Sequence, residues 1–271
     1  MPIVDSHIHL LPGRLAEKVR AFFEKNLAGQ LAYPIDPGAV CERLAEAGVT
    51  HAWTLPYAHR AGIAEGLNEA SAATVAARAG GPLSLVGGAT VHPDDPHPLA
   101  VMTRAVEELG LRVAKLHCSV GDYECTDPRL DGFWTYVSDH RIPVVIHAGH
   151  AQSGHTEASE LVAVDVLATR FPEARVIIAH CGHRAVPEAL ALVARHAQVH
   201  ADLTPVVGEA VAISADQAAP LARKLLFGSD APNVVRTVPQ GLAELDDWPI
   251  SPGARQAIKA DNALRLLSEL R

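Results

Sequence analysis

The sequence is short of the features that mark several classes of protein. Four cysteines in 271 residues are too few for a disulfide framework, and no Cys-x-x-Cys pair suggests a zinc–thiolate site. No run of lysine or arginine occurs, and the net charge of −8 argues against a surface for nucleic acid or an anionic membrane. No apolar stretch approaches the roughly 20 residues that span a bilayer.

The opening residues also lack a leader pattern. Met1-Pro2-Ile3-Val4-Asp5 has neither a basic segment nor the apolar core of a secretory signal. We therefore expect a cytoplasmic protein with no membrane or nucleic-acid partner.

Histidine, by contrast, is abundant, with 15 residues. His7 and His9 end the first apolar run, and residues two apart on a strand point to the same face. His147, His180 and Asp230 each end a later run of strand character. Imidazoles with one carboxylate are the donors that a zinc-like divalent ion prefers. The pattern predicts an active site at the carboxyl ends of strands.

Strand-like runs alternate with helical patterns almost to the end of the chain. The predicted strands are residues 3–9, 50–55, 84–91, 111–117, 143–148, 175–180, 198–203 and 224–230. The predicted helices are residues 37–47, 62–79, 97–109, 129–140, 157–170, 185–196, 213–222 and 236–246, followed by a final helix over 253–270. Strict alternation indicates parallel strands joined by crossover helices.

Eight such units favour a closed (β/α)₈ TIM barrel with an extra C-terminal helix. An open doubly wound sheet would begin with a glycine-rich dinucleotide turn, and the segment DSHIHLLPG has none. No linker or repeat divides the chain, so we expect one domain over residues 1–271, close to the roughly 250 residues of a typical barrel.

Other polar residues also end predicted strands, and each has a structural alternative. A single strand-end histidine such as His92 is more often a hydrogen-bonded core residue than a ligand. Lys115 can merely pair with a carboxylate, and His117 and His150 are undecided between the two interpretations. Cys118 is either a small core residue or part of a pocket wall, since no neighbour marks it as an activated nucleophile.

Taken together, these residues give the chain a resemblance to the amidohydrolase superfamily, and in detail to its amidohydrolase-2 branch, which includes aminocarboxymuconate semialdehyde decarboxylase and pyrone dicarboxylate lactonase. The motifs cover nearly the whole chain in order: Asp5-Ser6-His7-Ile8-His9, Val91-His92-Pro93, Lys115-Leu116-His117, Ile178-Ala179-His180-Cys181-Gly182, Gly228-Ser229-Asp230 and Asn262-Ala263-Leu264-Arg265-Leu266-Leu267.

The resemblance implies that His7, His9, His147 and Asp230 bind one divalent ion, usually Zn²⁺, with Mn²⁺ or Fe²⁺ able to share such ligands. It also implies that His180 acts as an acid/base and that Asp230 moves a proton as well as touching the metal.

Lys115 bears on the number of metal ions. In two-metal members of the superfamily a carboxylated lysine on strand 4 bridges both ions. The Lys-Leu-His sequence here looks like the one-metal branch, so we expect one ion. Lys115, His117 and Arg60, in the loop after strand 2, are then candidates to hold an anionic substrate group.

Two reactions fit this ligand set. We expect first a hydrolase that opens an ester, lactone or amide of a small, carboxylate-bearing molecule, because the loops after several strands are short. The alternative is a non-oxidative decarboxylase of a small aromatic or unsaturated acid. A metal-binding barrel without catalysis is a third interpretation, although no ligand or acid/base residue is missing. Related proteins are often dimers, so a homodimer is also an expectation.

Overall fold

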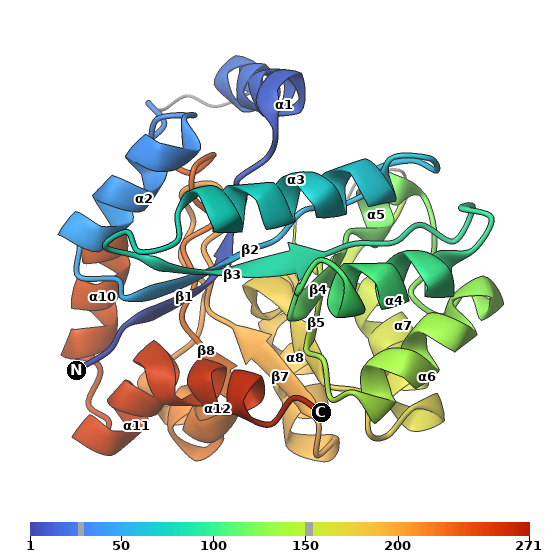
Figure 1. Cartoon of the computed structure of the whole chain (residues 1–271). Helices are drawn as coiled ribbons and strands as arrows, with labels where there is room; N and C mark the ends of the chain where they lie inside the picture. The colour runs from blue at the N-terminus through green and yellow to red at the C-terminus, as the bar shows by residue number, and fades with distance from the viewer. Residues whose placement is uncertain (27–29, 150–153) are drawn as a thin grey trace.

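A computed structural model describes residues 1–26, 30–149 and 154–271. Eight strands form one parallel sheet in chain order (Figure 1). They are β1 (Val4–Ile8), β2 (His51–Thr54), β3 (Ser84–Ala89), β4 (Val113–Leu116), β5 (Val144–Ile146), β6 (Val176–Ile178), β7 (Val199–Asp202) and β8 (Leu225–Leu226). The prediction of a TIM barrel with eight parallel strands is confirmed.

Backbone hydrogen bonds join the first strand to the chain that follows the last strand. Ser6 N donates to Phe227 O at 2.9 Å, and Asp230 N donates to His7 O at 2.9 Å. His9 N donates to Ala231 O at 2.7 Å. These bonds place Asp230 directly beside the two histidines of β1, although more than 200 residues separate them in the sequence.

Helices cover the outside of the barrel between successive strands (Figure 1). The main ones are α2 (Pro37–Glu46), α3 (Ala64–Ala77), α4 (Pro98–Glu107), α6 (Asp131–Asp139), α7 (Glu157–Arg170), α8 (Val186–Arg195) and α10 (Val238–Asp247). The helix predicted over 213–222 is wrong as one helix. That segment forms the short α9 (Ala215–Ala218) and a 3₁₀ segment, η3 (Ala219–Lys224), with Pro220 at the start of η3.

Two helices were not predicted. Helix α1 (Gly13–Asn26) has no buried residue, and α5 (Cys118–Gly121) is a single turn. A 3₁₀ turn, η1 (Pro128–Leu130), precedes α6, and η2 (Ala179–Ala185) is an irregular segment in which residues 180–183 have positive φ values. Among the described residues, no helix is both long enough and apolar enough to cross a membrane.

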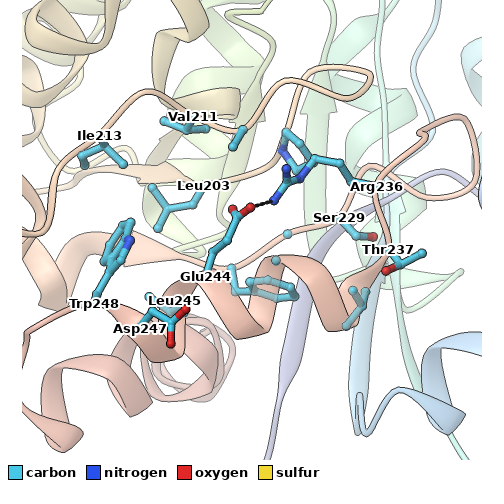
Figure 2. A pocket seen from close by; sticks show the side chains of 16 residues that line it. Leu203, Val211, Ile213, Ser229, Arg236, Thr237, Glu244, Leu245, Asp247 and Trp248 are labelled. Atoms are coloured by element: carbon cyan, nitrogen blue, oxygen red, sulfur yellow. Dashed lines mark ion pairs between the residues drawn. The ribbon is translucent and has the colours of Figure 1, made fainter. Parts of the chain in front are cut away.

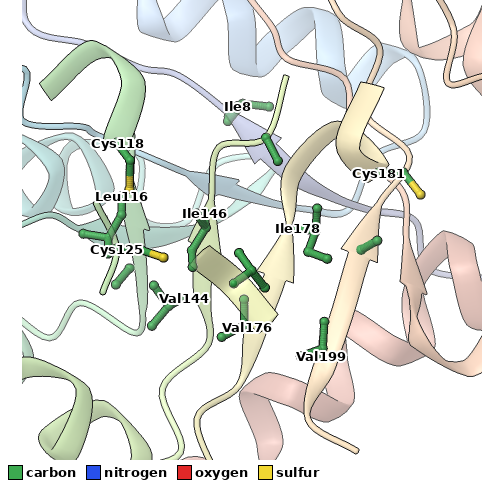
Figure 3. Close-up of a cluster of buried hydrophobic side chains, with 14 of the residues drawn as sticks. Ile8, Leu116, Cys118, Cys125, Val144, Ile146, Val176, Ile178, Cys181 and Val199 are labelled. Atoms are coloured by element: carbon green, nitrogen blue, oxygen red, sulfur yellow. The ribbon is translucent and has the colours of Figure 1, made fainter. Parts of the chain in front are cut away.

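Side chains alternate between two apolar clusters, one inside the barrel and one under the helices. Val144 and Ile146 pack in the outer cluster, whereas Val145 between them packs in the inner one. Figure 3 shows the outer cluster along β4 to β7, including Cys118, Cys125 and Cys181. All four cysteines are free and buried, which agrees with the expected lack of disulfides. Cys118 therefore packs in the core.

The predicted C-terminal helix is present but is not uniform. It consists of α11 (Pro252–Gln256), a π-helical turn, η4 (Ala257–Asp261), and α12 (Asn262–Ser268). Its Ala263 and Leu266 side chains belong to the inner cluster with Val4 and Val113. The C-terminal helix thus closes the amino-terminal end of the barrel, and the opposite end remains for the functional site.

One buried carboxyl group on α7 predicts how stability depends on pH. Glu160 is buried, and both of its oxygens lack a hydrogen-bond partner among the described residues. Burial raises its pKa to about 8 from an ordinary value near 4.5. Between these values the folded protein binds a proton that the unfolded chain has released. The free energy of unfolding should therefore fall as the pH rises from about 5 to 8.

We expect Glu160→Gln to remove this fall. At pH 8 the free energy of unfolding of the variant should exceed that of the wild type by about 2–4 kcal/mol, with little difference at pH 4.5. Urea denaturation at the two pH values measures the effect. Glu173→Gln, at an exposed position, serves as control and should follow the wild-type profile. A Glu160→Gln difference that does not change with pH would contradict the assignment.

Candidate metal centre

Three side chains converge at the carboxyl end of the barrel. One donor atom each from His7, His9 and Asp230 lies within 4.8 Å of the others. The His9 Nε2–Asp230 Oδ1 distance is 3.1 Å, and the His7 Nε2–Asp230 Oδ1 distance is 3.9 Å. The pairing of β1 with β2 shifts register between Asp5 and Ile8, and such bulges re-aim side chains beside active sites.

Second partners fix the orientation of both histidine rings. His7 Nδ1 lies 2.9 Å from Asp202 Oδ2, and His9 Nδ1 lies 2.7 Å from the carbonyl oxygen of Leu55. Because both partners accept hydrogen bonds, each Nδ1 carries a proton, and each Nε2 is left as the atom that a metal ion beside Asp230 would bind. Burial lowers the pKa of His7 to about 3, which keeps the ring neutral. Neutral imidazoles with a carboxylate fit a divalent metal ion.

Asp202 is the last residue of β7 and holds groups on both sides of the site. Its Oδ1 accepts hydrogen bonds from the backbone N–H groups of His180 at 2.8 Å and Thr204 at 3.1 Å, while Oδ2 accepts from His7. Although burial opposes ionisation, His7 and these bonds hold the pKa of Asp202 below its usual range. Asp202 therefore orients two histidines of the site at once.

His180 lies beside the three donors in a strained backbone segment. Its φ is 56°, and Cys181 and His183 also have positive φ values of 46° and 45°. Non-glycine residues in this region cost free energy, and they concentrate at functional sites. The ring centroid of His180 is 5.1 Å from that of His7. Its Nδ1 donates to the carbonyl oxygen of Thr204 at 3.2 Å, and burial lowers its pKa, so Nε2 is free to accept a proton.

His147 lies next to this group but outside the three-donor cluster. Its ring stacks on His117 at 3.7 Å between centroids and lies 4.9 Å from the ring of His180. The Nε2 atom of His147 is buried without a hydrogen-bond partner among the described residues. A buried nitrogen of this kind fits a metal or substrate atom. The role of His147 as fourth ligand stays a prediction.

The backbone beside His147 leaves no room for a side chain at Gly149. A Cβ atom there would lie 2.8 Å from His180 Cδ2 and 3.0 Å from His147 Cε1. We expect Gly149→Ala to displace both rings and to lower kcat by about 10-fold or more, because small displacements of positioned groups are costly in catalysis. Steady-state kinetics measures this effect. Gly66→Ala, where a Cβ meets open space, should keep wild-type kinetics, and equal rates for both variants would contradict the prediction.

The three predicted substrate-binding residues lie in different positions relative to the metal centre. Lys115 is fully buried, with Nζ 3.1 Å from His7 Nε2, and burial lowers its pKa to about 8. His117 faces the site through its stack on His147. Arg60 is exposed, and within the described part of the chain no hydrogen bond or ion pair joins it to the site. Its substrate role, like those of Lys115 and His117, stays a prediction.

Three further residues bear on the predictions from the sequence. His92 is buried, and its Nε2 donates to the carbonyl oxygen of Gly121 at 3.2 Å, which is the structural alternative considered for it. His150 lies outside the described residues. Tyr57 was not predicted, and its ring lies 5.4 Å from that of His9 and 5.0 Å from that of His117. Its position after an apolar strand carried no distinct signal.

Comparisons with known proteins agree with this architecture. The sequence model of a family described as Amidohydrolase matches residues 4–268. No curated protein matches the chain. Among solved structures, an uncharacterized TIM-barrel protein, Bb4693, from Bordetella bronchiseptica is similar at 22% identity and a TM-score of 0.76, covering 99% of both chains.

Two structures of named enzymes are also similar. Dihydroxybenzoic acid decarboxylase from Polaromonas sp. JS666, with bound manganese, has 15% identity and a TM-score of 0.75, covering 98% of this chain and 97% of its own. The 5-carboxyvanillate decarboxylase LigW from Sphingomonas paucimobilis has 14% identity and a TM-score of 0.70, covering 98% and 99%. At these identities the likeness shows the fold.

Proposed function

Because this chain belongs to the amidohydrolase family, we propose that it is a metal-dependent enzyme that decarboxylates a small aromatic or unsaturated acid without an oxidant. The observation that carries the proposal is the convergence of His7, His9 and Asp230, with the two histidine Nε2 atoms 3.9 and 3.1 Å from Asp230 Oδ1. Similarity to two decarboxylases supports this reaction over the hydrolysis favoured by the short loops.

In this proposal the chain holds one divalent ion, Zn²⁺ or Mn²⁺, through His7, His9, Asp230 and His147. Mn²⁺ is a candidate because it is bound in the similar Polaromonas enzyme. The ion would supply positive charge that orients and polarises substrate oxygens. Lys115 adds a buried amine beside His7, and His117 forms part of the wall against which a planar acid can lie.

The reaction replaces a carboxylate with a proton: the carbon–carboxyl bond breaks, CO₂ leaves, and a proton takes its place on carbon. His9 and other neighbouring histidines lower the pKa of Asp230 even though burial opposes this, so Asp230 is ionised at rest. Asp230 must therefore take a proton, from solvent or a substrate hydroxyl group, before it delivers one to carbon. The ring of His180, 5.1 Å from that of His7, can share this proton transfer.

Hydrolysis is the second candidate, and the free Nε2 of His180 favours it. That nitrogen can accept a proton from water while the backbone holds the ring in place. A dihydroorotase from Campylobacter jejuni is also similar in structure, with a TM-score of 0.62 at 15% identity. The residues of this site are compatible with both reactions, and the assay must distinguish them.

A matched pair of substrate panels tests the proposal. Protein loaded with Mn²⁺ or Zn²⁺ is incubated with hydroxybenzoates and other small unsaturated acids, and separately with lactones and cyclic amides. We expect CO₂ release from the first panel and no acid release from the second. Acid release from the lactone or amide panel without CO₂ from the first would favour hydrolysis. Arg129→Gln, at an exposed position that pairs with Asp94 and Asp127, should behave like the wild type.

We further propose that the enzyme acts in the cytoplasm on a free small molecule and that it works as a homodimer. Size-exclusion chromatography with light scattering tests the oligomeric state, and a monomer at assay concentrations would contradict it.

A further inference from the structure

A second cavity lies outside the barrel wall, separate from the candidate metal centre. It has a volume of about 320 Å³ and lies between the ends of β7 and β8, the loop over residues 205–213 and helix α10. Leu203, Phe227 and Ser229 line it. These residues alternate along the chain with Asp202 and Asp230, which face the metal centre. None of the metal-centre donors lines the cavity.

Most of the cavity wall is apolar. Leu203, Val211, Ile213 and Trp248 gather at one end, as Figure 2 shows. Predominantly apolar walls with a few polar groups are typical of small-molecule sites, and this volume is at the small end of their range. The shape therefore suits one ring or a short branched chain of carbon atoms.

An ion pair forms part of the polar wall of the cavity, which also includes Thr237 and the carboxylate of Asp247. Arg236 reaches towards the apolar group and pairs with Glu244 of α10 (Figure 2). The two partners differ in exposure: the side chain of Arg236 is 20% exposed, whereas that of Glu244 is 54% exposed. The Nη2 atom of Arg236 is buried and makes no hydrogen bond of good geometry to a described residue, although Glu244 lies beside it.

This asymmetry indicates the charge of the ligand. Arg236 is the less exposed member of the pair, and Glu244 now supplies the anionic partner that its charge requires. Glu244 is half exposed and can turn to solvent when another carboxylate takes its place. A guanidinium group also binds a carboxylate through two parallel hydrogen bonds. An amine, by contrast, would leave Arg236 facing a second cation.

We propose that this cavity is an accessory binding site for a small apolar monocarboxylic acid, with its carboxylate on Arg236 and its apolar body between Leu203, Ile213 and Trp248. The site does not depend on the reaction assigned to the metal centre. It lies on the opposite side of the chain from Asp202 and Asp230, and no metal-centre donor lines it.

Calorimetric titration of the metal-loaded protein with phenylacetate tests the proposal, with phenylacetamide as the uncharged control. We expect saturable binding of one phenylacetate per chain and binding of phenylacetamide at least 10-fold weaker. Arg236→Gln should weaken phenylacetate binding at least 10-fold. Glu244→Gln, which removes the competing carboxylate and leaves Arg236 in place, should strengthen it by about 3-fold or more. Arg129→Gln should leave it unchanged.

The metal centre could itself bind a carboxylate, so the titration is repeated on His9→Gln, which removes a metal-centre donor. Binding at the accessory site should persist in that variant. Absence of saturable binding up to about 10 mM, an unchanged affinity in both Arg236→Gln and Glu244→Gln, or loss of all binding in His9→Gln would overturn the proposal. Quenching of Trp248 fluorescence by phenylacetate, absent in Trp248→Phe, locates the ligand independently of the Arg236 variant.

Discussion

The Asp230→Asn variant is expected to lose at least about 10³-fold in kcat while remaining folded, because the asparagine amide can neither take nor deliver the proton that the reaction requires. Asp230 is the residue that contacts His9 directly and lies within reach of His7. Its backbone N–H is bonded to His7 O, so the substitution leaves its position in the barrel intact. The rate of CO₂ release under saturating substrate measures the effect.

Asp216→Asn, at an exposed position on α9, is the matched control and should keep the wild-type rate. Circular dichroism of both variants establishes that they are folded. A turnover rate of Asp230→Asn within about 10-fold of the wild type would show that Asp230 does not transfer the proton, whichever reaction the enzyme performs.

The Asp202→Asn variant is expected to bind the metal ion about 10- to 100-fold more weakly, since partners of this kind orient ligating histidines. Asp202 Oδ1 is held by two backbone N–H groups, so the asparagine oxygen should occupy that place. The new NH₂ group then faces Nδ1–H of His7, and two hydrogen-bond donors cannot bond to each other. Relief requires moving the proton of His7 to Nε2, which removes the lone pair that the metal needs. Competition with a fluorescent chelator measures the affinity.

Asp5→Asn provides the comparison for this prediction. Asp5 is also buried, and its Oδ1 accepts from the backbone N–H groups of His7 at 3.2 Å and Ser229 at 3.0 Å. Burial raises the pKa of Asp5 to about 7, so an amide replaces a carboxyl group that is already largely neutral at slightly acidic pH. We expect metal affinity to change by less than about 3-fold. Equal losses of metal affinity in Asp202→Asn and Asp5→Asn would show that Asp202 affects metal binding only through the stability of the fold.

The sequence predicted those parts of the fold that have a local signal. Most strands are short apolar runs, and the polar residues at the ends of β1, β5, β6 and β8 stand out against them. Because a closed barrel pairs its first strand with its last, predicting the barrel also predicts that His7 and Asp230 lie close together. Helix α1 had no such signal, since none of its residues is buried.

The role of Asp202 could not be predicted from the sequence. It depends on a hydrogen bond to His7 across 195 positions of the chain and on the orientation of one carboxylate between two strands. The position of His147 outside the three-donor cluster likewise depends on ring packing against His117 and on the space left by Gly149. Local patterns identify candidate donors, whereas their partners are set by packing between strands.

Anomalous diffraction from crystals grown with Mn²⁺ or Zn²⁺, together with elemental analysis of the same protein, tests the metal centre most directly. We expect one ion per chain, about 2.0–2.2 Å from His7 Nε2, His9 Nε2 and an Asp230 oxygen. Metal-replete protein that holds no ion at this place, or an ion bound elsewhere in the barrel, would contradict the proposed centre and the chemistry that depends on it.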